Sequence, residues 1–243
     1  MLFGLFWGDW TILIVLPGLI FTLIAQAMVR SAYEAGARVS MPWGMTGGAL
    51  ARRMLDANGM ADVRIERVPG TLTDHYDPRE RVLRLSENVY TGANAAAVGV
   101  AAHEAGHAMQ DARGYVPLRL RMAMVPVTNF GARMAMPLFL IGLIFTSLFR
   151  TGILFFEWLM LAGILAFSLS VLFQLVTLPV EFNASRRALR SLAGSGTMSE
   201  EQLRAARRVL SAAAMTYVAS LAVGLLSLLR LLLIFSSASS RRR

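Results

Sequence analysis

The chain has 243 residues, of which 56% are hydrophobic and 16% are charged. A soluble domain of this length needs more polar surface to cover its core, so the composition excludes an ordinary soluble protein and favours one that lies largely in lipid. The chain contains no Cys, which excludes disulfides, thiolate zinc sites and Cys nucleophiles.

The net charge is +9, and all 24 basic residues are Arg. These residues flank apolar segments. Proteins that bind single-stranded nucleic acid typically interleave basic with aromatic residues, and this chain does not. Arg clusters beside apolar segments are typical of loops at an anionic membrane surface. We therefore expect the lipid bilayer as a partner, and no nucleic acid.

The first apolar segment is Trp10–Met28, which has 19 residues and no charge. A bilayer core about 30 Å thick requires roughly 20 helical residues, so this segment is long enough to cross it. Ala25-Gln26-Ala27 resembles a signal-peptide cleavage site, but no basic residue precedes the apolar run. Residues 1–28 are thus predicted to form a retained N-terminal transmembrane helix.

Residues 29–121 form the main polar region and carry short elements of both kinds. Thr46 is a suitable N-cap for the first helix, and Gly59 is a suitable stop. Alternation of apolar and polar residues predicts the first strand, and a short apolar run after the turn-like Asp77-Pro78 predicts the second. An Ala-rich run predicts a second helix. The predicted elements are a helix over Met45–Asn58, strands over Val63–Val68 and Val82–Leu85, and a helix over Ala93–Ala112.

Three further apolar segments follow the polar region. The first two are joined by only a few residues, so residues 122–180 are predicted to form a transmembrane hairpin. Residues 181–208 are an Arg-rich connection, and residues 209–243 a last transmembrane helix whose Ser-rich end, from 236 onwards, is predicted to be disordered. The three predicted spans are Met134–Phe149, Trp158–Pro179 and Val209–Phe235.

The distribution of Arg predicts the orientation in the membrane. Residues 29–121 and 181–208 are rich in Arg, whereas the short connection inside the hairpin holds only Arg150. Arg-rich loops face the cytoplasm, so we expect both regions on the cytoplasmic side of the cell (inner) membrane. Both termini would then lie outside, although the Arg241–Arg243 tail opposes this orientation.

The segment His103-Glu104-Ala105-Gly106-His107 carries the strongest indication of chemistry. Residues four apart on a helix share a face, so both imidazoles can bind one metal ion. Zinc activates a water molecule, and Glu104 beside the two His is placed to act as its general base. Two buried imidazoles among alanines would otherwise need other polar partners. Zn2+ is therefore the predicted cofactor.

A catalytic zinc ion usually has three protein ligands. The chain contains one other histidine, His75. Glu181 is the second candidate because it directly follows the third span, where a carboxylate needs a partner. Arg113 stands where the longer metzincin motif would place its third histidine. The residues themselves leave His75 and Glu181 as alternatives.

Three separated motifs resemble the bacterial YugP-like neutral zinc metallopeptidases, over roughly Met45 to Leu189. The motifs are Thr73–Pro78, Gly99–Ala108 and Leu178–Phe182. The chain is more distantly similar to CAAX prenyl-protease and HtpX-type membrane metallopeptidases, in which a Glu zinc ligand follows a transmembrane hairpin in an E-x-x-x-D pattern. This resemblance implies Glu181 as the third ligand. Ser185 stands in place of that Asp, and Asp111 is an alternative partner for the histidines.

In those relatives an edge strand that binds the substrate precedes the HExxH helix, and residues 72–77 match it. Backbone pairing with an extended peptide is a general mode of recognition. His75 or Tyr76 on this strand would then donate a hydrogen bond to the oxyanion that forms during hydrolysis. The alternative is a turn around Asp77-Pro78 that leaves His75 in solvent.

Together these observations predict a mainly α-helical membrane protein with about four transmembrane helices and a small α+β zincin-like metalloprotease unit. The expected activity is that of a membrane-embedded zinc endopeptidase that acts on a peptide or protein substrate, membrane proteins included. We expect His103, His107 and Glu181 to bind zinc, and Glu104 and His75 to be catalytic. A non-catalytic zinc-binding membrane scaffold or chaperone is the alternative, which Glu104 disfavours because a scaffold needs no base.

Overall fold

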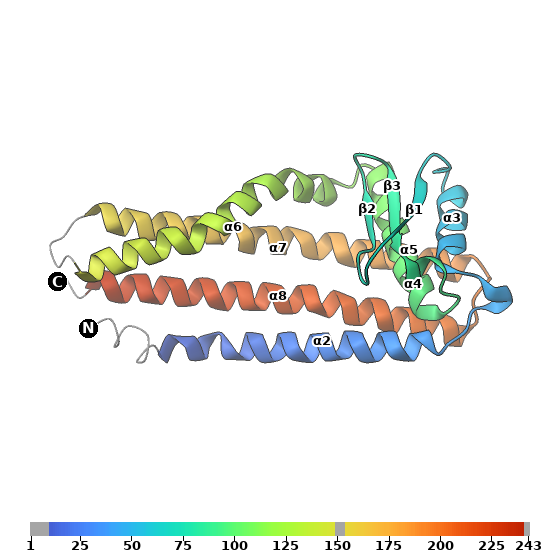
Figure 1. Ribbon diagram of the computed structural model, residues 1–243, viewed down its shortest axis with the longest axis horizontal. Coiled ribbons are helices and arrows are strands. Elements are labelled where there is room, and N and C mark those ends of the chain that lie inside the picture. Colours follow the sequence, from blue (N-terminus) through green and yellow to red (C-terminus); the bar gives the residue numbers. More distant parts are fainter. Residues whose placement is uncertain (1–9, 149–153, 241–243) are drawn as a thin grey trace. The chain divides into compact units, whose positions relative to one another are not determined.

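The computed structural model describes residues 10–148 and 154–240, and the chain is mainly helical with one small sheet (Figure 1). The chain divides into two compact units, one formed by the described residues of 1–23, 120–177 and 217–243 and the other by residues 24–119 and 178–216. The elements are η1 (Trp10–Ile14), α2 (Leu16–Ala37), η2 (Pro42–Gly44), α3 (Gly47–Ala57), β1 (Arg64–Val68), β2 (His75–Asp77), β3 (Val82–Ser86), α4 (Glu87–Tyr90), α5 (Ala95–Ala112), α6 (Val116–Leu148), α7 (Leu154–Gly194) and α8 (Glu200–Ser240).

Among the described residues, four helical stretches are long and apolar enough to cross a membrane. They are η1 together with α2, and the long helices α6, α7 and α8. With the three-stranded sheet, this confirms the predicted fold class. The helices extend well beyond the predicted spans, because polar residues with good helix propensity continue the same hydrogen-bonded ladder. Phe149 and the first residues of the hairpin connection lie outside the described residues.

Within the first unit, glycines allow α6 and α7 to pack closely. A Cβ atom on Gly142 would lie 2.6 Å from the Phe156 carbonyl oxygen, and one on Gly163 would lie 2.7 Å from the Ala135 carbonyl oxygen. Small residues at such contacts let membrane helices approach until their backbones touch.

The C-terminal end differs from its prediction. Residues 236–240, which were predicted to be disordered because of their Ser content, continue α8 as far as Ser240. Serine is only moderately unfavourable in a helix, and a helix that is already nucleated extends at little cost. Residues 241–243 lie outside the described residues.

The second unit contains a mixed sheet with the strand order β1-β3-β2. Strand β3 pairs parallel with β1 and antiparallel with β2, so β2 forms one edge. Both predicted strands are confirmed, as β1 and β3. Strand β2 is the part of segment 72–77 that becomes regular, and Asp77 at its end also accepts hydrogen bonds from the backbone amides of Arg79 and Glu80. An edge strand and a turn therefore both occur there.

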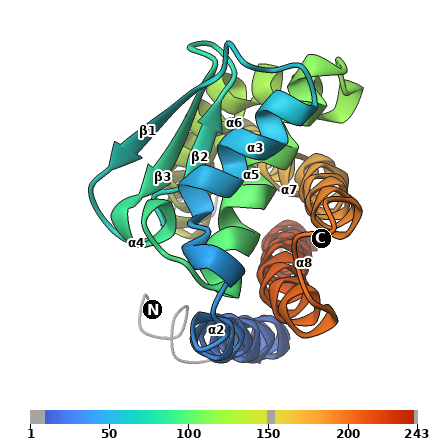
Figure 2. The same ribbon diagram turned by 90° about the vertical axis from the view of Figure 1, so that its right-hand side faces the viewer.

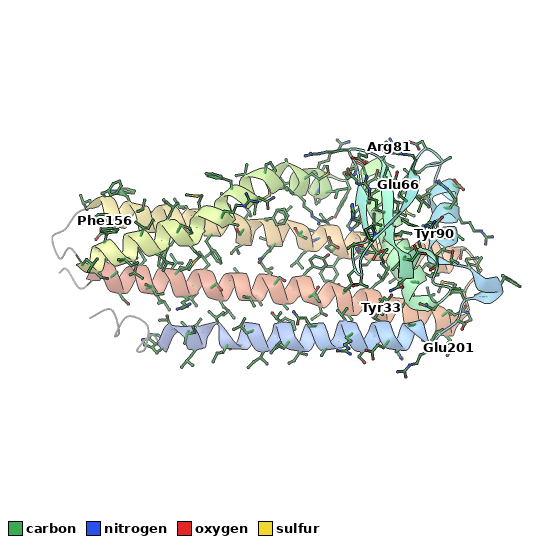
Figure 3. All side chains as sticks on the ribbon, viewed as in Figure 1. Tyr33, Glu66, Arg81, Tyr90, Phe156 and Glu201 are labelled. Carbon is green, nitrogen blue, oxygen red and sulfur yellow. The ribbon has the colours of Figure 1, made fainter. Side chains whose placement is uncertain are left out.

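The two faces of this sheet differ. On the outer face Arg84 of β3 contacts Glu66 of β1 and Asp77 of β2, both at 3.4 Å. Figure 3 labels Glu66, together with Arg81, which precedes β3. Leu83 and Leu85 belong to the buried core.

Helix α5 packs against strands β2 and β3 of the sheet, and helix α3 packs against α5 (Figure 2). Thr46 caps α3 by accepting a hydrogen bond from the Ala49 amide at 3.2 Å, and Gly59 after its end has a φ of 75°. Such a positive φ is available to Gly at little cost, so both predicted boundary signals are confirmed. The core holds apolar side chains of α3, β3, α5, α7 and α8, and it fixes α5, which carries the HExxH segment.

Candidate metal centre

Helix α5 positions the two histidines of the motif. It begins after Asn94, whose side chain caps the helix by accepting a hydrogen bond from the Ala97 amide at 3.0 Å. The predicted helix over Ala93–Ala112 is confirmed within two residues. His103 and His107 lie one turn apart on the same face, and their ring centroids are 4.8 Å apart.

A close approach of α7 to α5 supplies the rest of the cluster. A Cβ atom on Gly106 would lie only 2.6 Å from the carbonyl oxygen of Ala184, so only Gly fits there without a shift. This contact places Glu181 and Ser185, which lie on either side of Ala184 along α7, next to the histidines of α5.

The three candidate ligands form one compact group. The Nε2 atom of His103 lies 3.1 Å from Oε2 of Glu181, and Nε2 of His107 lies 3.7 Å from the same oxygen. Each residue offers one ligand atom, and these atoms lie within 4.8 Å of one another. The Glu181 side chain is 2% exposed, whereas the histidine side chains are 15% and 11% exposed. The carboxylate is therefore buried, whereas the two imidazoles are partly accessible to solvent.

Gln110 fixes the orientation of His107. Its Nε2 atom donates to the carbonyl oxygen of Val180 at 2.8 Å and to Oδ1 of Asn183 at 3.1 Å. Since both partners are acceptors, the Oε1 atom of Gln110 must face Nδ1 of His107, 3.0 Å away. Nδ1 of His107 therefore carries a proton, and the lone pair of the neutral ring lies on Nε2, which faces Glu181.

His103 is held in the same manner by α7, because its Nδ1 atom lies 3.0 Å from Oγ of Ser185. Ser185 thus takes the place of the Asp in the related pattern. Asp111, considered above as an alternative, instead accepts a hydrogen bond from the hydroxyl of Tyr76 at 3.0 Å. The contacts of Gln110 and Ser185 were not found from the sequence, because they depend on where α7 packs.

The donor set fits a zinc ion. With both Nδ1 atoms engaged, the Nε2 atoms of the two imidazoles converge on the buried carboxylate of Glu181, and a cation or protons are needed between these groups. Burial lowers the pKa of His107, but the hydrogen bond that the protonated ring donates to Glu181 and the negative charges of Glu104 and Glu181 outweigh it, so the pKa lies above its ordinary value of 6.5. Two imidazoles and one carboxylate are a ligand set of catalytic zinc sites.

The remaining predicted residues lie as follows. Glu104 is half-buried on α5 beside the histidines, and its charge acts on His107. His75 is exposed on β2, where it pairs with Arg84 of β3, and its Nδ1 atom lies 2.8 Å from the Thr73 carbonyl oxygen. It is not a member of the cluster. Its neighbour Tyr76 points instead towards α5, because successive side chains of a strand alternate.

Comparison with known proteins agrees with this geometry. The family model described as "Putative neutral zinc metallopeptidase" matches residues 11–236, nearly the whole chain. The chain belongs to this family. The match includes all three residues of the cluster and nearly all of the four long helices.

One curated protein is similar over most of the chain. It is the "Putative membrane protease YugP" of Bacillus subtilis (strain 168), which is 47% identical over 211 residues, or 87% of this chain and 90% of that protein. No solved structure matches the chain. The family resemblance expected from the three motifs is confirmed, and the zinc-metallopeptidase assignment at family level rests on these two matches.

Proposed function

We propose that the protein is a membrane-embedded zinc endopeptidase, with zinc held by His103, His107 and Glu181. The observation that carries this proposal is the convergence of the three ligand atoms within 4.8 Å, with both imidazoles oriented from behind by Ser185 and Gln110. Partners of this kind fix the tautomer of metal-binding histidines and are typical of built metal sites.

A bound zinc ion would supply Lewis acidity, which polarises a peptide carbonyl and acidifies water. Glu104 neighbours His103 in sequence and is half-buried. The third ligand position is filled by Glu181, so Glu104 is free for another role. We assign it the role of general base, in which its carboxylate accepts a proton from the attacking water and then returns that proton to the departing amine.

The substrate is proposed to bind as an extended peptide along the edge strand β2. An edge strand offers unpaired backbone groups to a further strand. The hydrogen bond from Tyr76 to Asp111 ties this strand to α5, the helix that carries the histidines. Burial and this hydrogen bond raise the pKa of Tyr76, which keeps its hydroxyl protonated and the tie intact at physiological pH.

His75 and Tyr76 were the two residues predicted above to donate a hydrogen bond to the oxyanion. Tyr76 has one hydroxyl proton, and it is donated to Asp111. His75 lies on the same edge strand, but its side chain faces the opposite side of the strand from Tyr76 and thus away from α5. A catalytic role for His75 is therefore a proposal that rests on the family resemblance alone. Replacement of His75 by Ala should then lower cleavage without changing zinc content.

The decisive experiment exchanges Glu104 for Gln, which keeps the shape and volume of the side chain but removes the proton acceptor. Purified wild-type protein should contain about one zinc ion per chain, and the Gln variant should contain the same amount, because Glu104 is not a ligand. Cleavage of casein in detergent should fall by roughly 10²–10⁴-fold, the usual contribution of general-base catalysis.

Alanine at His103 provides the matched control, since it should remove zinc and cleavage together. A Glu104→Gln variant that still cleaves casein would show that a contaminating protease is responsible. If that variant also replaces the wild type in a cellular function that requires the protein, the non-catalytic scaffold is the better description.

The side of the membrane on which the centre lies is proposed, from the Arg distribution, to be cytoplasmic.

A further inference from the structure

A second polar site lies between α5 and α7, in the same unit as the histidines. It is an open cavity of about 290 Å³ to which Arg113, directly after the end of α5, and three arginines of α7 contribute. The α7 arginines are Arg186, Arg187 and Arg190, and Asn58, Asn183 and Ser191 complete the polar part of its lining. None of the side chains that line this cavity is acidic.

The four arginines gather positive charge without a protein counter-charge. In the part of the chain that the structure describes, none of them forms an ion pair with a carboxylate, whereas Arg52, Arg64 and Arg81 of the same unit each do. Like charges this close repel one another, so an anion in the cavity would relieve that repulsion. Guanidinium groups bind phosphate through paired hydrogen bonds, which favours a phosphate group over a halide.

The cavity is joined to the metal centre by hydrogen bonds. Nε of Arg187 donates to Oδ1 of Asn183 at 2.7 Å, and Nε2 of Gln110 donates to the same oxygen at 3.1 Å. Gln110 in turn holds Nδ1 of His107. Three hydrogen bonds thus lead from a side chain that lines the cavity to a proposed zinc ligand, and Arg187 keeps its two terminal nitrogens for an anion.

The position along α7 fits a group at a membrane surface. Arg187 lies eight positions after Pro179, the predicted end of the third span, which corresponds to about 12 Å of helix. The headgroup layer is roughly 5–8 Å deep on each side of the apolar core, and an Arg side chain is long enough to cover the difference. Phosphates of lipid headgroups and free phosphate in solution could both reach the cavity.

We propose that this cavity binds a phosphate group and that its occupancy strengthens zinc binding at His107. An anion on the terminal nitrogens of Arg187 restrains that side chain, which in turn restrains Asn183 and Gln110. The existence of the phosphate site is independent of the proposed function, whereas the effect of bound phosphate on zinc affinity rests on the proposed function. The experiment therefore measures the two separately.

The first measurement is anion binding to the full chain in non-ionic detergent. The probes are inorganic phosphate, by equilibrium dialysis, and phosphatidylglycerol in mixed micelles, with phosphatidylcholine for comparison. Arg187→Gln with Arg190→Gln should lower binding of one or both anionic probes at least tenfold. Arg207→Gln with Arg208→Gln, the same charge change at exposed positions outside the cavity, should not.

The outcome identifies the source of the anion. Loss of phosphatidylglycerol binding alone indicates a lipid headgroup, and loss of inorganic phosphate binding indicates free phosphate. Equal losses in both double variants, or no loss in either, would overturn the proposal, because binding would then follow net charge alone or not occur at the cavity. If the cavity variant does not fold, Arg190→Gln alone carries the same comparison, since that side chain is exposed.

The second measurement is zinc affinity, by competition with a chelator, with and without the probe that binds. The wild type should bind zinc about fivefold or more tightly when the anion is present, the lower end of common coupling between sites. Asn183→Ala keeps all four arginines but breaks the chain of hydrogen bonds, so it should bind the anion and lose the coupling. Coupling that persists in this variant refutes the hydrogen-bonded route. Absence of zinc from every preparation would contradict the proposed function instead.

Discussion

Replacement of Gly106 by Ala tests whether the approach of α7 to α5 builds the metal centre. The added Cβ would lie 2.6 Å from the Ala184 carbonyl oxygen, whereas ordinary contact begins near 3.4 Å. Because the clash involves backbone on both sides, no side chain can turn away to relieve it. Helix α7 must therefore move by up to about 0.8 Å at this point.

A shift of that size is large for a metal site, whose ligand distances hold to about 0.2 Å. Ala184 lies less than one turn from both Glu181 and Ser185, so the movement carries the proposed third ligand and the partner of His103 with it. Overpacking of a close contact costs about 1–3 kcal/mol. If that cost falls on the zinc-bound geometry, zinc affinity drops by roughly 5–150-fold.

Zinc affinity in detergent, measured by competition with a chelator, provides the assay. The matched control is Gly99→Ala on the same helix, where the new Cβ would lie 3.5 Å from Ala206, an ordinary contact. That variant should bind zinc as the wild type does and gain slightly in stability, since Ala favours a helix by up to about 1 kcal/mol over Gly. A folded Gly106→Ala protein with wild-type zinc affinity would refute the argument that this contact sets the ligand geometry.

Three other predictions concern the ligands and the topology. Glu181→Gln should weaken zinc binding far more than His75→Ala, because Glu181 lies in the cluster and His75 does not; metal analysis of the two variants checks this, and the reverse order would give the ligand role to His75. Zinc affinity should fall as the pH falls through the pKa of His107, because a protonated imidazole has no lone pair for a metal, and the raised pKa places the onset of this fall above pH 6.5. Competition titrations between about pH 5 and 8 measure the zinc affinity, and an onset at or below pH 6 would contradict the raised pKa. A reporter fused after Arg243 should be located outside the cytoplasm if the Arg distribution sets the orientation, and a cytoplasmic signal would show that the orientation is inverted or that α8 does not cross the membrane.

The sequence by itself determined the parts of this protein that depend on local pattern. Apolar runs long enough for a bilayer predicted the four long helices, because a single helix satisfies its own backbone in lipid and needs no partner to be recognised. The caps at Thr46 and Gly59 predicted α3 for the same reason, since capping involves only neighbours in the chain. The spacing of His103 and His107 placed two candidate ligands on one face of α5.

The tertiary structure decided which distant residues contact His103 and His107. On the residues alone the sequence left His75 and Glu181 as alternatives, and the contact between Gly106 and Ala184 brings Glu181 to the histidines. The same packing selects Gln110 and Ser185 as their hydrogen-bond partners and gathers the four arginines around one cavity. No local pattern encodes these choices, because each depends on the register and rotation of α7 against α5, which are set by the close packing of their small residues.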